Sequence, residues 1–241
     1  LALYRAKADG RNRFHAFDTS LDASARRRNL IEQELRAAIA NETLSLHFQP
    51  LADSRDRQIV CAEALLRWHH PTLGAISPME FIPIAEDIGL IDKIGAWVIR
   101  EGCLTAAAWP TPMRIAVNLS PRQFTGSGLY AGIAAALRDS GLPPSRLELE
   151  VTESLLLKTD ALVESTLVAI KALGVRIALD DFGTGYSSLS YLRKYRFDKL
   201  KIDQSFISDI ETNADSRAIV DAVIRLGHDL GMSIAAEGVE T

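Results

Sequence analysis

Residues 177–185 join an apolar run to two adjacent aspartates and a glycine-rich segment, in the order Ile-Ala-Leu-Asp-Asp-Phe-Gly-Thr-Gly. The apolar run is typical of a buried strand, and the glycines after it are typical of a loop. Burying Asp180 and Asp181 side by side without a partner would cost several kcal/mol. Divalent cations are the usual remedy, and two of them about 3.5–4 Å apart form a common phosphoryl-transfer site. A solvated turn is the more common meaning of an Asp-Asp pair alone, so the rest of the chain must distinguish the two interpretations.

Alternating strands and helices are predicted along most of the chain. The expected strands are residues 44–49, 59–68, 114–119, 147–152, 176–181, 199–202 and 233–236. Helical periodicity is clearest at residues 78–88, 91–109, 130–140, 160–173 and 216–230, with helix caps expected at 159–160 and 215–216 and C-terminal glycines at 141, 174 and 231. Repeated strand–helix units indicate an α/β fold with a parallel sheet, and at 241 residues a TIM-like (β/α)8 barrel is the expected architecture.

The seven predicted strands are one fewer than this barrel requires. An open seam would leave unpaired backbone groups beside the first strand. We therefore expect residues 1–241 to lack the last strand and helix of the barrel, and the polypeptide to continue past Thr241.

Composition excludes several classes of protein. A net charge of −4 gives no basic signature for a DNA or RNA duplex. Cys61 and Cys103 are widely separated and form neither a metal motif nor a disulfide framework. The sequence contains no apolar stretch long enough to span a membrane and no signal-peptide core. We expect a cytoplasmic domain, although segments upstream could anchor a longer parent protein in a membrane.

Polar residues gather at the C-terminal ends of the predicted strands, which is the rim where parallel barrels carry their chemistry. They are Gln49, Glu63, Asn118, Glu150, Glu153, Asp180, Asp181, Asp203, Glu237 and Glu240. Helix capping explains Asp and Asn at such positions but explains several Glu residues poorly. So many carboxylates at one rim predict bound cations, and oxygen ligands without His or Cys favour Mg²⁺, Mn²⁺ or Ca²⁺ over zinc.

The rim residues belong to six motifs that occur in the order found in one known family. They are EALLRW at 63–68, NLS at 118–120, EVTE at 150–153, DDFGTGYS at 180–187, KID at 201–203 and EGVE at 237–240. This set resembles the EAL-domain cyclic-di-GMP phosphodiesterases, and the resemblance covers the chain from about residue 44 to its end.

The N-terminal residues resemble a different domain. Residues 1–18 are similar to the last helix and strand of a GGDEF domain, so the parent resembles a tandem GGDEF–EAL protein. The expected layout is a GGDEF remnant at 1–18, a connecting helix at 19–42 and the EAL domain at 43–241. The run Arg26-Arg27-Arg28 on the connecting helix is interpreted as a solvated face because acids follow it.

The resemblance implies hydrolysis of cyclic di-GMP to linear pGpG with two metal ions, Mg²⁺ or Mn²⁺, whereas Ca²⁺ is expected to inhibit. One metal would be held by Glu63, Asn118, Glu150 and Asp180. Asp180 would bridge to a second metal, which Asp181 and Glu237 complete. Lys201 would position or deprotonate the attacking water, and Glu237 is the other candidate base.

The resemblance also implies residues that hold the substrate and its loop. Arg67 would grip a phosphate oxygen, for which a planar guanidinium is suited. Gln49 would touch the guanine or ribose, and Asp203 and Glu240 are further substrate-binding candidates. Glu153 would hold the loop 181–186 in place.

Two alternatives stay open at this point. A catalytically silent receptor would bind cyclic di-GMP without cleaving it, although such receptors typically lose carboxylates or the glycine-rich loop that are present here. An unrelated metal-dependent barrel enzyme, such as an enolase-type lyase, would require an accidental match. The resemblance further implies a homodimer, and upstream GGDEF and sensory domains in the parent.

Overall fold

The computed structural model describes residues 19–41, 43–126, 128–156, 161–183 and 189–239. The chain divides into two compact units, one formed by residues 1–45 and 66–91 and the other by residues 46–65 and 92–241. The predicted GGDEF remnant at residues 1–18 lies outside the described residues, so this layout stays a prediction. Among the described helices, none combines the length and the apolar character needed to cross a bilayer.

The first unit is built on the helices α2 (Thr19–Ala40) and α3 (Pro78–Asp87) and on a short antiparallel pairing. The end of β2 (Ile59–His70) pairs with β3 (Gly74–Ile76), a strand too short to be predicted from periodicity. Trp68 on β2 is buried and meets Phe81 of α3 edge to face at 5.5 Å. Apolar burial and aromatic contact therefore hold this unit together.

The arginine run on α2 is more than a solvated face. Arg27 donates to both carboxylate oxygens of Glu80 on α3, at 2.8 and 3.2 Å, and Arg28 donates to Asp87 at 2.8 Å. The periodicity of α2 correctly placed these side chains at the surface but carried no information about α3, which is more than 50 residues away. All four side chains are partly exposed, so these pairs contribute little to stability individually.

The second unit contains the parallel sheet. Its strand order is β1-β2-β4-β5-β6-β7-β8, and every neighbouring pair from β2 to β8 is parallel. The strands are β1 (Leu44–Ala52), β2, β4 (Arg114–Leu119), β5 (Leu147–Thr152), β6 (Arg176–Phe182), β7 (Lys199–Ile202) and β8 (Ser233–Ala236). All seven predicted strands are confirmed, as are the α/β class and the sheet of a TIM-like barrel.

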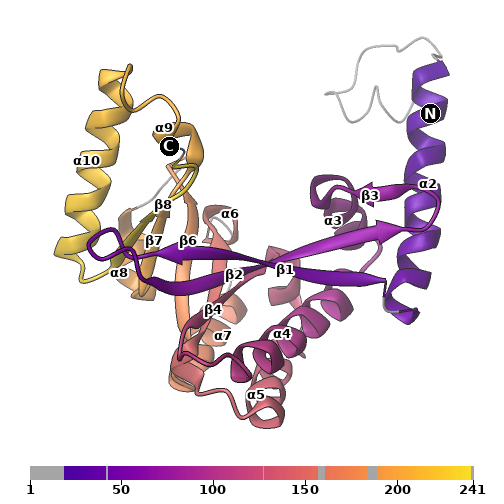
Figure 1. Cartoon of the computed structure of the whole chain (residues 1–241), viewed down its shortest axis with the longest axis horizontal. Helices are drawn as coiled ribbons and strands as arrows, with labels where there is room; N and C mark the ends of the chain where they lie inside the picture. Colours follow the sequence, from indigo (N-terminus) through magenta and orange to yellow (C-terminus); the bar gives the residue numbers. More distant parts are fainter. Residues whose placement is uncertain (1–18, 42, 127, 157–160, 184–188, 240–241) are drawn as a thin grey trace. The chain divides into compact units, whose positions relative to one another are not determined.

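Helices follow the strands of this sheet. They are α4 (Ile91–Ala107), η1 (Pro121–Thr125), α5 (Gly128–Ser140), η2 (Pro144–Arg146), α6 (Glu153–Leu156), α7 (Ala161–Ala172), α8 (Leu189–Tyr195), α9 (Gln204–Ile207) and α10 (Ala214–Asp229). Figure 1 shows α10 beside β7 and β8. The short helices α6, α8 and α9 were not predicted, because fewer than two full turns give no clear periodicity.

Helix ends agree with the sequence in part. Gly141, Gly174 and Gly231 have positive φ angles after α5, α7 and α10, as predicted. The expected cap of α10 at 215–216 is wrong, because the helix begins two residues earlier. Asn213 is the cap, and its side-chain oxygen accepts hydrogen bonds from the backbone N–H groups of Asp215 and Ser216. Asparagine competes well with Asp and Ser for this position.

The two faces of the parallel sheet carry different kinds of side chain. One face of β5 carries Leu147, Leu149 and Val151, whereas the other carries Glu148 and Glu150. The same alternation continues on the neighbouring strands. The aliphatic face of β4 packs against α4, where a Cβ added to Gly102 would lie 3.1 Å from Ile115 Cδ1. The helices therefore cover the aliphatic face, and the charged face is left for chemistry.

Candidate metal centre

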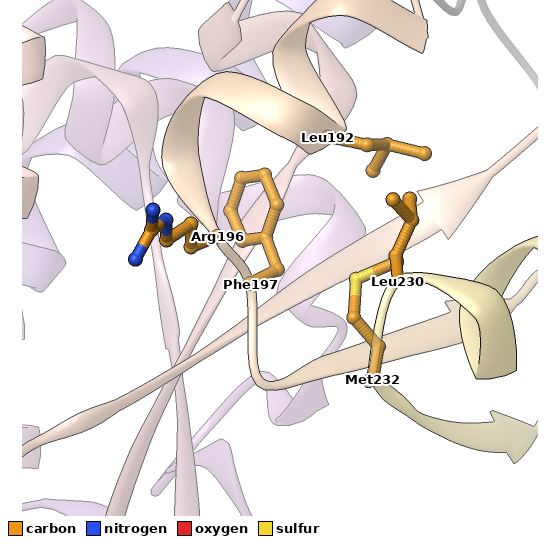
Figure 2. Close-up of a pocket in the computed structure, with 5 residues that line it drawn as sticks. All are labelled: Leu192, Arg196, Phe197, Leu230 and Met232. Carbon is orange, nitrogen blue, oxygen red and sulfur yellow. The ribbon is translucent and has the colours of Figure 1, made fainter.

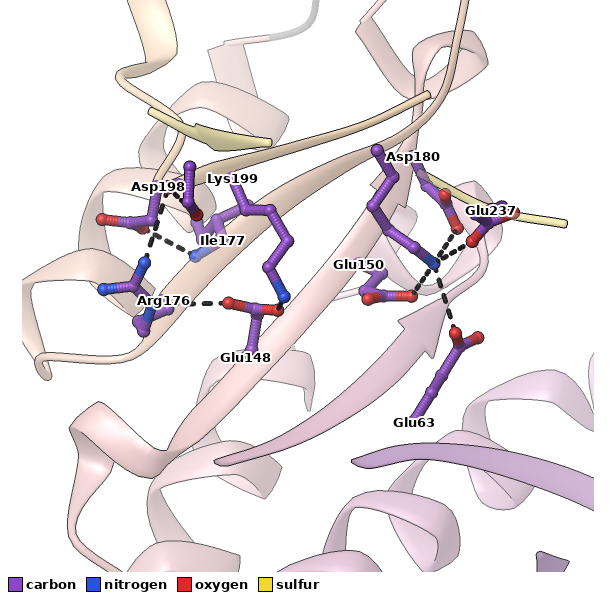
Figure 3. Close-up of polar contacts among 11 residues, drawn as sticks. Glu63, Glu148, Glu150, Arg176, Ile177, Asp180, Asp198, Lys199 and Glu237 are labelled. Atoms are coloured by element: carbon purple, nitrogen blue, oxygen red, sulfur yellow. Dashed lines mark hydrogen bonds and ion pairs between the residues drawn. The ribbon is translucent and has the colours of Figure 1, made fainter. Parts of the chain in front are cut away.

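Four carboxylates surround the ammonium of Lys201 on β7 (Figure 3). Lys201 Nζ lies 2.6 Å from Glu150 Oε2, 2.7 Å from Glu237 Oε1, 3.1 Å from Asp180 Oδ2 and 3.3 Å from Glu63 Oε2. Glu150 and Asp180 lie in the second halves of β5 and β6, and Glu237 directly follows β8. Glu63 is the fifth of the twelve residues of β2, in the part of that strand that pairs with β4. The parallel sheet therefore brings these residues together. One ammonium can offset the charge of only one carboxylate, and the cluster therefore has capacity for further cations.

Burial and mutual repulsion change the ionisation of the cluster. Burial raises the pKa of Glu150 above its ordinary value, and the charges of Glu63 and Asp180 raise it further, against the opposing effect of Lys201. Burial alone would lower the pKa of Lys201, but the surrounding carboxylates of Glu150, Asp180 and Glu63 raise it overall. Lys201 is therefore held in its charged form at neutral pH.

The donor set fits a hard divalent cation. Glu150 is 1% exposed, and among the described residues its Oε1 has no hydrogen-bond partner. A buried carboxylate oxygen without a partner is costly, and a metal ion is one group that would satisfy it. Asn118 Nδ2 donates to Glu63 Oε1 at 2.7 Å, so these two predicted ligands already contact each other.

An irregularity in β6 brings Asp180 and Asp181 to one site. In a regular strand, adjacent side chains point to opposite faces of the sheet. The pairing of β6 with β7 shifts between Leu179 and Phe182, and Asp181 has a φ of 54°. Carboxylate oxygens of Asp180, Asp181 and Glu237 consequently lie within 4.8 Å of one another, a group that could hold one metal ion. Burial, followed by the charges of Asp180 and Asp203, raises the pKa of Asp181.

Helix α9 fixes the turns that follow two of these carboxylates. A Cβ on Gly183 (φ 102°) would lie 2.7 Å from the ring of Phe206, and a Cβ on Gly238 (φ 67°) would lie 2.3 Å from Gln204 Cγ. Both positions therefore require glycine for close approach and for backbone conformation. Asp203, predicted to bind substrate, caps this helix by accepting a hydrogen bond from the backbone N–H of Ser205 at 2.9 Å.

Glu153 contacts the start of the glycine-rich segment. It is the first residue of α6, directly after β5, and its Oε1 accepts a hydrogen bond from the backbone N–H of Gly183 at 2.9 Å. The rest of the segment that Glu153 was predicted to hold, residues 184–186, lies outside the described residues. The contact ties Glu153 to the same turn that α9 packs against.

The structure thus brings together seven of the predicted site residues. Those brought together are Glu63, Asn118, Glu150, Asp180, Asp181, Lys201 and Glu237. Gln49 is an exposed residue of β1, and Glu240 lies outside the described residues. Arg67 lies in the first unit and donates to the carbonyl of Leu66 at 2.9 Å. The roles of these three residues stay predictions.

The sequence analysis missed a second buried ion pair, shown in Figure 3. Lys199 and Glu148 form this pair, and Arg176 Nε donates to Glu148 Oε2 at 3.3 Å. The sequence could have indicated this pair. Glu148 stands two residues before Glu150, and Lys199 stands two residues before Lys201, so each shares a strand face with a member of the cluster. Strand prediction treated these positions only as interior residues.

The structure also contains a cavity of about 410 Å³, lined by Leu192, Arg196, Phe197, Leu230 and Met232 (Figure 2). Arg196, Phe197 and Met232 directly precede β7 and β8, so the cavity lies by the N-terminal ends of these strands. Glu237 of the Lys201 cluster directly follows β8, so it lies at the opposite end of that strand. The cavity therefore takes no part in the metal centre.

The chain is similar in sequence to several known proteins. The family model of the EAL domain matches residues 32–241. An uncharacterized signaling protein of Caulobacter vibrioides is 50% identical over 241 residues, which are 100% of this chain and 30% of that protein. The bifunctional diguanylate cyclase/cyclic di-GMP phosphodiesterase MucR of Pseudomonas aeruginosa is 43% identical over 244 residues, covering 100% of this chain and 36% of MucR. The chain spans about a third of the length of these relatives.

A solved structure is similar over most of both chains. The PaMucR phosphodiesterase, determined as a c-di-GMP complex, has a TM-score of 0.84 and 43% identity, covering 88% of this chain and 87% of that one. The family match extends over most of the sequence and includes every residue of the Lys201 cluster. The chain therefore belongs to the EAL domain family.

Proposed function

We propose that this protein hydrolyses cyclic di-GMP to linear pGpG with the help of two divalent metal ions, Mg²⁺ or Mn²⁺. The observation that carries the proposal is the cluster of four carboxylates around Lys201 on one face of the parallel sheet. The names of MucR and of the PaMucR complex support the choice of substrate.

We assign two overlapping ligand sets to the cluster. Glu63, Asn118, Glu150 and Asp180 would hold one metal ion. Asp180, Asp181 and Glu237, whose carboxylate oxygens lie within 4.8 Å of one another, would hold the second. When bound, the metals would neutralise the phosphate and lower the pKa of a water molecule. The irregularity at Asp181 supports the shared role of Asp180, because both aspartates reach the same place.

The ionisation of Lys201 and Glu237 suggests different roles for the two candidate bases. The carboxylates keep Lys201 protonated, so its ammonium would donate hydrogen bonds and orient the water. Glu237 is partly exposed, and burial together with the charges of Asp180 and Glu63 raises its pKa despite the contact with Lys201. Glu237 is the other candidate for the proton acceptor, beside its proposed role as a ligand of the second metal ion.

Turnover of cyclic di-GMP by the purified protein tests the proposal. With Mg²⁺ or Mn²⁺, pGpG should form, and EDTA should abolish its formation. Ca²⁺ should support little turnover, because its longer and looser coordination would misplace the water. Equal rates with and without EDTA would refute the metal mechanism. Binding of cyclic di-GMP without turnover at any metal concentration would instead support a receptor.

The Glu153→Ala variant should need more metal to reach a given rate. Glu153 holds the backbone of Gly183, two residues after the proposed ligand Asp181, so its loss should loosen that ligand without removing it. Residues that orient metal ligands typically change metal affinity by about 10–100-fold when replaced. Rates measured over a Mn²⁺ series should show partial recovery at high metal. A wild-type metal dependence would remove Glu153 from this role.

Assembly and context complete the proposal. The family resemblance suggests a homodimer, and GGDEF and sensory segments upstream. MucR is itself named as both a diguanylate cyclase and a cyclic di-GMP phosphodiesterase. Sedimentation of the purified protein would test the dimer.

A further inference from the structure

The ion pair between Glu148 and Lys199 is more deeply buried than most charged groups in this protein. Glu148 is 0% exposed and Lys199 is 4% exposed. Neither is among the residues that contact Lys201. Groups this costly to desolvate call for an explanation, because well-packed apolar residues would give equal or better stability at the same place.

The pair repeats the geometry of the metal centre one layer lower in the sheet. Glu148 and Lys199 lie on β5 and β7, and the contact between Glu150 and Lys201 joins the same strands two residues further along. Side chains two residues apart on a strand share a face and stack in layers inside a barrel. The lower pair therefore supports the upper pair from directly below it along both strands.

Both pairs must cross β6, which lies between β5 and β7 in the sheet. Ala178 occupies the crossing point, since it is in register with Glu150 on β5 and with Lys199 on β7. Its methyl group leaves space for the long side chains above and below. The two pairs thus act as two cross-links between strands that have no backbone hydrogen bonds to each other.

Further polar contacts hold the Glu148–Lys199 pair in place. Arg176, in the same layer, donates to Glu148 and to the carbonyl of Asp198 at 3.4 Å. The carboxylate of Asp198 accepts from the backbone N–H of Ile177 at 2.8 Å and from Lys171 at 2.9 Å. These contacts fix the starts of β6 and β7 relative to each other, so the position of Lys199 is determined by neighbours on two sides.

We propose that Glu148 and Lys199 are positioning residues that set the spacing of β5 and β7 for metal binding by the cluster above. The inference rests on the proposed two-metal function. Four carboxylates at the strand ends repel one another and would spread the strands. A buried pair of opposite charges one layer below opposes that spreading, and would hold Glu150 on β5 and Lys201 on β7 in place beside Asp180.

The double variant Glu148→Gln/Lys199→Met removes both charges while keeping side chains of similar size. Mn²⁺ affinity of the purified protein, measured by electron paramagnetic resonance titration, should weaken about tenfold or more. The thermal midpoint in EDTA should stay close to wild type, because no unpaired charge remains in the pair. This combination separates positioning from a purely structural role, which would change the thermal midpoint and leave Mn²⁺ affinity unchanged.

A matched control is Lys194→Met, which removes the exposed contact with Glu164 and leaves the buried pair and its anchor intact. It should bind Mn²⁺ as wild type does. Wild-type Mn²⁺ affinity in the double variant, or an equal loss in Lys194→Met, would overturn the inference. If the double variant does not fold, Glu148→Asp is the alternative test, because aspartate keeps the negative charge but has a shorter side chain. It should also weaken Mn²⁺ binding, and wild-type Mn²⁺ affinity would overturn the inference. Failure of the wild-type protein to bind Mn²⁺ would count against the proposed function instead.

Discussion

Replacing Glu63 by alanine should lower the rate of cyclic di-GMP hydrolysis by roughly 100-fold or more at ordinary Mg²⁺ concentrations. Residues that merely orient a ligand change metal affinity or activity by about 10–100-fold, and loss of a ligand should cost more. Glu63 contacts both Asn118 and Lys201, so its loss also removes the link between two other members of the site. Formation of pGpG, followed at several metal concentrations, should show a lower kcat with a smaller change in KM.

Glu211→Ala is the matched control for this variant. Glu211 is an exposed carboxylate that follows α9 and is outside the Lys201 cluster. Its removal should leave turnover unchanged. A Glu63→Ala protein with near wild-type turnover would show that Glu63 is not a metal ligand.

The Lys201→Met variant should be strongly destabilised in the absence of metal. Lys201 is the common partner of four carboxylates, and removing one partner of a buried ion pair typically costs about 3–5 kcal/mol. Methionine keeps much of the side-chain volume, so the loss reflects charge more than packing. Denaturant unfolding in EDTA measures the free-energy difference from wild type.

The destabilisation of Lys201→Met should depend on pH in a defined direction. Burial and the nearby acids already raise the pKa of Glu150, and loss of Lys201 removes an influence that lowers it. A carboxyl group with a raised folded pKa contributes stability that is complete below its unfolded pKa of 4.5 and is lost as pH rises through the folded value. The variant should therefore lie nearest to wild type at acidic pH, where the carboxyl groups are protonated in both proteins, and its deficit should grow as the pH rises. A deficit independent of pH would mean that packing, not charge, explains the loss.

The sheet could be predicted because its signals are local. Apolar runs of four to seven residues and the helices between them fixed every strand from β4 to β8 to within one residue. Polar residues at strand ends gave most of the metal centre, because the C-terminal ends of parallel strands share one edge. Asn118 and Glu237 needed no more than this rule, whereas Glu63 is the fifth of the twelve residues of β2 and does not stand at its end.

Other features depend on contacts that no local pattern encodes. The conformation of Asp181 arises from the pairing of β6 with β7, so the sequence could show two acids but not how both reach one site. The fourfold contact of Lys201 depends on how the strands are offset across the sheet. The partners of Arg27 and Arg28 lie on α3, far along the chain. These are consequences of tertiary structure, which can override or extend what periodicity indicates.

The separation of aliphatic and charged side chains onto opposite faces of the sheet has a practical consequence for engineering. Leu149 and Ile115 belong to the scaffold, whereas Glu150 and Asn118, one or three residues away in the sequence, belong to the reaction. The backbone lies between the two sets, and substitutions without shared partners usually add independently. Thermal stability could therefore be improved by substitutions on the aliphatic face of the sheet, and turnover could be altered by substitutions on the charged face. Each property could be optimised in a separate library of variants.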